Sequence, residues 1–248
     1  MLFMTCRSTD KNVDACLAHQ ELFGRFVNPR WEGPELQNWN VWVGDNGAFT
    51  GFDQDVFMKA IKGLLPYRDT CKCLTVPDVP FFWEPTLVKF KDWSPSIRRM
   101  GFPVGLAVQD GATVNNILWD EIDALFIGGS TYWKRDGAML PQYKSPVGEI
   151  IAEAKVRNKW VHIGRSANSK KQLAYAYNIG ADSVDGTNET KMPDHEFKKW
   201  IAPTMWSIHK HSIEHPDLPY GKRRNTPNRK PKKIIISPNQ LSFYSIVE

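Results

Sequence analysis

Short segments rich in β-branched and aromatic residues recur along this chain at intervals that leave room for a helix between them. Seven are identified, at residues 2–6, 40–44, 71–76, 104–108, 124–127, 160–163 and 182–184. Stretches between them carry apolar residues at helical spacing, notably 53–64, 146–157 and 169–179. This alternation predicts parallel strands joined by helical crossovers. It favours a TIM-type (β/α)8 barrel over an open doubly wound sheet, with the eighth strand unassigned.

The length of the chain is that of one barrel. At 248 residues it matches the roughly 250 residues that an α/β barrel commonly uses as a single domain. Residues 1–215 are predicted to form this α/β domain, and residues 216–248 a basic, Pro-rich C-terminal extension. No stretch approaches the roughly 20 apolar residues that cross a bilayer, and the N-terminus lacks the features of a secretory signal. Four cysteines without a disulfide-framework spacing favour reduced thiols, so a cytoplasmic location is expected.

Positive charge is concentrated in the C-terminal extension. Residues 222–233 hold seven Lys and Arg and no acid, and without them the formal charge of the chain changes from +5 to −2. Such a run is usually solvated, and it can also bind phosphates without sequence preference. A solubilising tail and a nucleic-acid contact therefore both stay open. The candidate phosphate-binding residues are Lys222, Arg223, Arg224, Arg229 and Lys230, together with Arg165 at the end of a predicted strand.

Small and polar residues follow nearly every predicted strand. They are Asp45-Asn46-Gly47, Pro77-Asp78, Gln109-Asp110-Gly111, Gly128-Gly129-Ser130, Gly164-Arg165 and Asp185-Gly186-Thr187. Any one of these groups could be a turn or a helix cap. The carboxyl ends of parallel strands, however, meet at one edge of the fold, and ligands bind there. Their joint occurrence predicts a polar ligand site at that edge.

The side chains in these groups suit a guanine-like base. A carboxylate such as Asp78 can accept hydrogen bonds from the ring N1–H and the exocyclic amine, while the Gln109 amide or the Gly129 N–H can donate to O6. Asp45 and Asp185 are then available for glycosidic-bond chemistry, in which one carboxylate attacks the anomeric carbon and the other handles protons. The pattern predicts an enzyme that acts on a nucleic-acid base.

Four short motifs resemble those of the tRNA-guanine transglycosylase superfamily. Residues 45–49 (Asp-Asn-Gly-Ala-Phe) resemble its Asp-Ser-Gly-Gly-aromatic motif, and residues 108–111 (Val-Gln-Asp-Gly) its Val-Gln-Gly-Gly base-recognition loop. Residues 127–129 resemble the Gly-Gly that follows, and residues 180–185 the segment that carries the nucleophile. The order and approximate spacing agree over residues 40–187, roughly three-fifths of the chain. The resemblance places the nucleophile at Asp185, whereas strand register alone leaves open whether Asp182 or Asp185 faces the pocket.

The resemblance implies a defined reaction. Asp185 attacks C1′ of the target nucleotide, guanine leaves, and a covalent glycosyl-enzyme forms. Asp45 then deprotonates an incoming 7-deazaguanine of the preQ0 type, which takes guanine's place. Phe49 stacks on the base, whose edge is read by Asn46, Asp78, Gln109, Gly128 and Gly129. The exchange implies no ATP, cofactor or catalytic metal, and a base in a duplex must first be flipped out.

Two departures from the tRNA enzymes bear on the substrate. Those enzymes are longer and carry a zinc site of three Cys and one His after the nucleophile, whereas this chain has no Cys after Cys73. No metal site is predicted, and Cys71 and Cys73 are interpreted as core residues. The DNA-acting 7-deazaguanine transglycosylases of bacteria and phages resemble the chain more closely. DNA is therefore favoured over tRNA as partner, in the cytoplasm of a bacterium or a phage-infected host, with an accessory protein and a homodimer left open.

Three alternatives stay open. The first is the same base exchange on tRNA, as by a queuine or preQ1 tRNA-ribosyltransferase. The second is an N-glycoside hydrolase that releases the base, with water in place of the incoming base. The third is a nonenzymatic nucleic-acid-binding module, in which the basic extension binds and the aspartates are structural.

Overall fold

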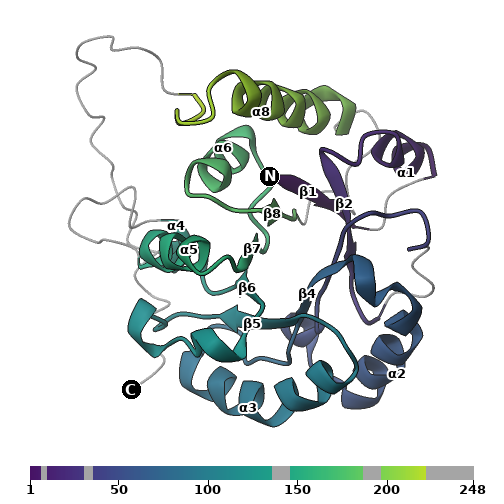
Figure 1. Cartoon of the computed structure of the whole chain (residues 1–248), viewed down its shortest axis with the longest axis vertical. Helices are drawn as coiled ribbons and strands as arrows, with labels where there is room; N and C mark the ends of the chain where they lie inside the picture. The colour runs from purple at the N-terminus through teal and green to yellow at the C-terminus, as the bar shows by residue number, and fades with distance from the viewer. Residues whose placement is uncertain (7–9, 31–35, 136–145, 187–196, 222–248) are drawn as a thin grey trace, which may run out of the picture.

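The chain folds into a closed barrel of eight parallel strands, seen in the computed structural model of residues 1–6, 10–30, 36–135, 146–186 and 197–221 (Figure 1). Neighbours in the barrel follow sequence order: β1 (Leu2–Thr5), β2 (Phe23–Val27), β3 (Trp42–Gly44), β4 (Cys71–Thr75), β5 (Val104–Val108), β6 (Ala124–Ile127), β7 (Trp160–Ile163) and β8 (Ser183–Val184). The ring closes where Leu2 pairs with Ser183 and Phe3 with Val184. The (β/α)8 barrel predicted from the sequence is confirmed.

The strand that the sequence pattern left unassigned is β2. It pairs in parallel with β1 on one side and β3 on the other. Gly24 and Arg25 interrupt its apolar run, so the hydrophobicity pattern of the sequence does not predict a strand here. A Cβ at Gly24 would lie 2.7 Å from the Met4 methyl carbon and 3.0 Å from the Val41 carbonyl oxygen, so any larger residue would force the buried Met4 side chain to move. The strand is therefore specified by its neighbours in the barrel more than by its own residues.

Helices surround the barrel (Figure 1). They are α1 (Asp10–Leu17), α2 (Gln54–Leu64), α3 (Trp83–Arg99), α4 (Thr131–Arg135), α5 (Val147–Val156), α6 (Lys170–Asn178) and α8 (Ala202–Glu214), with short 3-10 segments η1 (Ala48–Thr50), η2 (Leu65–Thr70), η3 (Val114–Asn116) and η4 (Trp119–Glu121). The side chains of Asp53 and Ser169 cap α2 and α6 by accepting hydrogen bonds from Val56 N and Gln172 N. Gly180, at φ +92°, follows the end of α6, as the sequence predicts.

The core has an inner and an outer part. The inner part is a small cluster of buried side chains: Met4, Cys6, Phe26, Val43, Cys73 and Ala124. The outer part joins the other faces of the strands to the helices and includes Cys71. All four cysteines are buried, and none of them forms a disulfide. The interpretation of Cys71 and Cys73 as core residues is confirmed.

The last described elements pack against α6 and β2. The sequence predicts a helix over 193–211, of which 193–196 lie outside the described residues; a π-helical segment, η6 (Phe197–Ile201), leads into α8. Figure 1 shows α8 beside α6, close to the N-terminus. Tyr220 exchanges two hydrogen bonds with Asn178, so the first residues assigned to the C-terminal extension contact the barrel. No described helix is long and apolar enough to cross a membrane.

Candidate active site

A cavity of about 480 Å³ opens at the carboxyl ends of the strands. Each of the eight strands contributes a lining residue at or just beyond its end: Cys6, Asn28, Asp45, Asp78, Gln109, Gly128, Gly164 and Asp185. All the catalytic and base-binding candidates from the sequence line it, namely Asp45, Asn46, Phe49, Asp78, Gln109, Gly128, Gly129 and Asp185. Barrel closure therefore brings together catalytic and base-binding candidates that lie as many as 140 positions apart.

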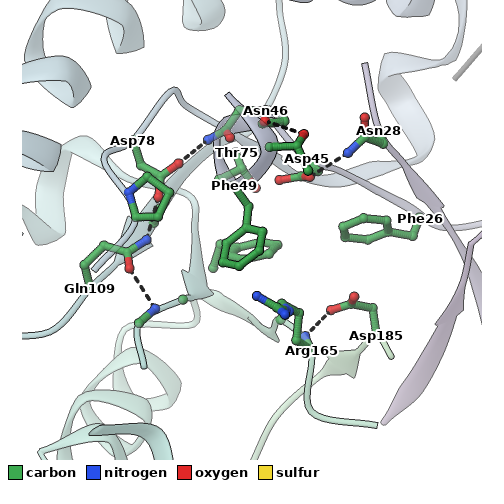
Figure 2. Close-up of a pocket in the computed structure, with 18 of the residues that line it drawn as sticks. Phe26, Asn28, Asp45, Asn46, Phe49, Thr75, Asp78, Gln109, Arg165 and Asp185 are labelled. Atoms are coloured by element: carbon green, nitrogen blue, oxygen red, sulfur yellow. Dashed lines mark hydrogen bonds between the residues drawn. The ribbon is translucent and has the colours of Figure 1, made fainter. Parts of the chain in front are cut away.

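One wall of the cavity is a hydrogen-bonded chain of amides around Asp78 (Figure 2). Asn46 Nδ2 donates to Asp78 Oδ1 (2.8 Å), and Gln109 Nε2 donates to Asp78 Oδ2. Gln109 Oε1 in turn accepts from the backbone N–H of Gly129 (2.7 Å) and of Phe81 (2.9 Å). Because Oε1 faces two donors and Nε2 faces a carboxylate, the orientation of the Gln109 amide is determined. These hydrogen bonds fix the side chains of Asn46, Asp78 and Gln109 relative to one another.

This wall requires small residues beside it. A Cβ at Gly128 would lie 2.6 Å from Gln109 Nε2, so only glycine leaves space for the amide. Burial raises the pKa of Asp78 above its ordinary value, although the hydrogen bonds from Asn46 and Gln109 and the nearby Lys89 oppose the rise. Whether Asp78 is protonated therefore depends on its burial and on these neighbouring groups.

Gln109→Leu is expected to lower the free energy of unfolding by about 2–4 kcal/mol, because it removes one of the two side-chain donors to buried Asp78 and the shared acceptor of two part-buried backbone N–H groups. Urea unfolding followed by circular dichroism measures this. The matched control is the same substitution at exposed Gln54, expected to change stability by less than about 0.5 kcal/mol. Equal effects at the two positions would contradict the assigned network.

Asp45 lies across the cavity from Gln109, at the end of β3. Asn28 Nδ2 donates to its Oδ2 (2.9 Å). Burial, followed by the negative charge of Asp78 and a smaller effect of Asp185, raises the pKa of Asp45 to about 7, although the backbone N–H groups of Asn46 and Gly47 lower it. A carboxyl group with this pKa can both give and take a proton near neutral pH.

Asp185 is held firmly at the end of β8. Its Oδ1 accepts from the backbone N–H of Arg165 (2.7 Å), and its own carbonyl accepts from the N–H groups of Ser166 and Ala167 (both 2.9 Å). The side chain is only 7% exposed and borders the cavity (Figure 2). The expectation that Asp185 faces the cavity is thus met.

Asp182 has a different environment, which resolves the register question. Its carboxylate pairs with Lys155 Nζ (2.6 Å) and accepts from Val161 N (2.8 Å). Asp182 does not border the cavity. Of the two aspartates, only Asp185 is positioned for chemistry there.

The mouth of the cavity is aromatic and cationic. Phe49 is 54% exposed, its ring lies edge-on to Phe81 at 6.0 Å, and the Arg165 guanidinium lies 4.0 Å from its centre. Phe81 and Arg165 have φ of +73° and +56°, conformations that cost a non-glycine residue energy and often occur at functional sites. Arg165, a candidate for phosphate contact, is placed over the ring expected to stack on a base. A base that stacked on this face of Phe49 would have to displace the guanidinium.

Several lining residues were not singled out from the sequence as base-binding or catalytic candidates. Asn28 was missed because it follows β2, the unassigned strand. Phe26 and Phe126 also line the cavity. Lys134 is buried and donates to the Gly164 carbonyl (2.9 Å). Its position four residues after Ser130 indicates only weakly, from the sequence, that it lies at the cavity. The tail candidates Lys222, Arg223, Arg224, Arg229 and Lys230 lie outside the described residues.

Metal-binding side chains do not gather in the described part of the chain: it contains no group of three or more His, Cys, Asp or Glu residues with suitable geometry. The three cavity carboxylates of Asp45, Asp78 and Asp185 instead contact amide and backbone donors. What the site offers is a set of hydrogen-bonding side chains beside two acidic groups. That arrangement suits recognition of a polar planar ligand together with proton transfer and nucleophilic attack.

Comparison with known proteins supports the fold. No family model matches the sequence, and no curated protein matches it. Among solved structures, a mutant mandelate oxidase with a C4a-OH-FMN adduct is 12% identical, with a TM-score of 0.51 over 86% of this chain and 74% of that chain. The YdjI aldolase of Escherichia coli K12 (10% identity, TM-score 0.48, 88% and 91% covered) and the Amycolatopsis orientalis BexX/CysO complex (13%, 0.48, 92% and 94%) are also similar. The chain is a (β/α)8 barrel, the fold that it shares with the oxidase.

Proposed function

We propose that this protein is a transglycosylase that exchanges guanine in DNA for a 7-deazaguanine base of the preQ0 type, through a covalent intermediate on Asp185. The observation that carries the proposal is the pairing of an amide-and-carboxylate wall, centred on Asp78, with the carboxyl groups of Asp45 and Asp185 in one cavity. The motif resemblance to the tRNA-guanine transglycosylase superfamily supports the same assignment.

The wall has hydrogen-bonding capacity left for a guanine edge. A carboxylate has about four lone-pair positions, and two of those on Asp78 are used by Asn46 and Gln109. The others can accept from N1–H and the exocyclic amine. The second Nε2 proton of Gln109 can donate to O6, a role that the Gly129 N–H cannot take while it is bonded to Gln109 Oε1. One purine edge thus meets acceptors and a donor in the required order.

The chemistry needs only the two carboxyl groups. Asp185 attacks C1′, the bond from C1′ to N9 of guanine breaks, and Asp45 donates a proton to the departing base. The incoming 7-deazaguanine then returns its N9 proton to Asp45 and attacks C1′, which breaks the ester bond to Asp185. The pKa of Asp45, about 7, allows it to be acid in the first half and base in the second.

DNA is proposed as the substrate for two reasons. The chain has no Cys beyond Cys73 and so cannot form the zinc site of the tRNA enzymes as those enzymes build it. Residues 222–233 carry seven positive charges that can bind a phosphate backbone without base preference. Base exchange on tRNA and hydrolytic base release are the alternatives that the experiment below separates.

The test is incubation of the full chain with guanine-containing DNA or tRNA and a preQ0-type base, digestion to nucleosides and mass spectrometry, with Asp185→Ala as the matched control. A deazaguanine deoxynucleoside, formed by the wild type alone, is expected. A modified ribonucleoside from tRNA alone would reassign the substrate, and free guanine released without added base would indicate a hydrolase. If neither DNA nor tRNA gives a product, even with host extract present, the proposal is overturned.

A further inference from the structure

His162 lies beneath the floor of the cavity and contacts Asp185. Its side chain is fully buried and is not part of the cavity lining. The rings of Phe26 and Phe126 flank it, with centres 5.7 and 4.9 Å away. Its Nε2 lies 3.2 Å from Asp185 Oδ1, and its Nδ1 lies 2.9 Å from Ser183 Oγ. The imidazole is therefore fixed in place by rings on its faces and polar partners at both nitrogens.

The Asp185 carboxylate can only accept hydrogen bonds, and it sets the direction of this hydrogen-bond chain. Trp160 Nε1 lies 3.0 Å from Ser183 Oγ, and an indole N–H can only donate. Ser183 Oγ therefore accepts from Trp160 and can still donate its hydroxyl proton to Nδ1 of His162. A neutral ring then carries its proton on Nε2, where it points at the Asp185 carboxylate. The opposite tautomer would set the Nε2 lone pair against a carboxylate lone pair.

We infer that His162 is a positioning residue that fixes which oxygen of Asp185 reacts. Oδ1 accepts from both His162 Nε2 and the Arg165 backbone N–H. Within the described part of the chain, no donor hydrogen-bonds to Oδ2. Oδ2 is therefore the oxygen that attacks, while Oδ1 becomes the carbonyl oxygen of the ester and keeps its two donors. The identity of the atom that Asp185 attacks rests on the proposed function. The hydrogen bond from His162 to Asp185 and its direction do not.

The first test needs no activity. Long-range ¹H–¹⁵N correlation spectra of the ¹⁵N-histidine-labelled full chain report which nitrogen of each of its six histidines carries a proton, and His162→Gln identifies the His162 signals by their loss. We expect a proton on Nε2 in the wild type and in Trp160→Phe, which keeps Ser183. Ser183→Ala is expected to mix the tautomers. A ring protonated on Nδ1 alone in the wild type would overturn the inference, whatever reaction the protein catalyses.

The second test separates positioning from packing. His162→Leu removes the donor but keeps an apolar side chain of similar volume, and it is expected to lower kcat by about 10²-fold, because the nucleophile loses its alignment. His162→Gln, which can present an N–H to Oδ1, is expected to recover most of this loss. KM should change by less than about threefold in both, because His162 does not border the cavity. Equal kcat in the two variants, or a loss confined to KM, would contradict a positioning role.

Discussion

Asp185→Asn is expected to lower the rate of the proposed base exchange by at least about 10⁴-fold, the largest effect expected of any substitution, since removal of a covalent nucleophile costs this much or more. The amide is close to isosteric, and its oxygen can still accept from Arg165 N and His162. Binding of the base, which we assign to the Asp78 wall, should persist. Single-turnover kinetics measure the rate, a denaturing gel shows whether the covalent protein–DNA adduct still forms, and titration with the preQ0-type base measures its binding.

Asp182→Asn is the matched control for this experiment. Asp182 lies three residues earlier, pairs with Lys155 and does not border the cavity. Its substitution should leave the rate within about twofold of the wild type, because a partly exposed ion pair contributes little energy. Loss of activity in both variants, or an adduct that survives in Asp185→Asn, would remove Asp185 from its assigned role.

Asp45→Asn has the second largest expected effect and changes the pH dependence. Because the pKa of Asp45 is about 7, the half-reaction that needs its acid form should slow as pH rises through 7, and the half-reaction that needs its base form should speed up. Asp45→Asn should lose about 10²–10⁴-fold in rate and lose both pH limbs. Pre-steady-state rates of guanine release and of deazaguanine incorporation, measured from pH 5.5 to about 8.5, test this. Parallel pH profiles for the two half-reactions would contradict the shared proton carrier.

The same substitution should stabilise the protein at high pH. Asp45 has a folded-state pKa raised to about 7 from an ordinary 3.8, so it favours folding below pH 4 and this contribution is lost as pH rises through 7. The loss is at most about 4 kcal/mol and smaller where cavity water reaches the carboxyl group. Asp45→Asn should therefore gain stability over the wild type between pH 5 and about 8, by urea unfolding. Asp69→Asn, on a fully solvated side chain, is the control and should show no such trend.

The sequence by itself determined the fold class and which acidic and amide residues at the ends of seven strands meet in one site. Alternating strand and helix patterns are local properties of the chain, and they placed seven of the eight strands to within two residues at either end. Because parallel strands in one barrel share a direction, residues after their ends meet at one edge whatever the detailed packing. That is why Asp45, Asp78, Gln109 and Asp185 could be assigned to one site.

The tertiary structure decided what these residues contact. The sequence pattern did not predict β2 or the role of Asn28, because a Gly-Arg pair breaks the apolar run of this strand. Its pairing with β1 and β3 becomes apparent only when the barrel closes. The His162 contact with Asp185 spans 23 positions and depends on the register of β7 against β8. The pKa of Asp45 depends on burial and on the carboxylates of Asp78 and Asp185, which are far from Asp45 in the sequence. Such properties arise from distances between segments, which a linear pattern does not contain until the barrel closes.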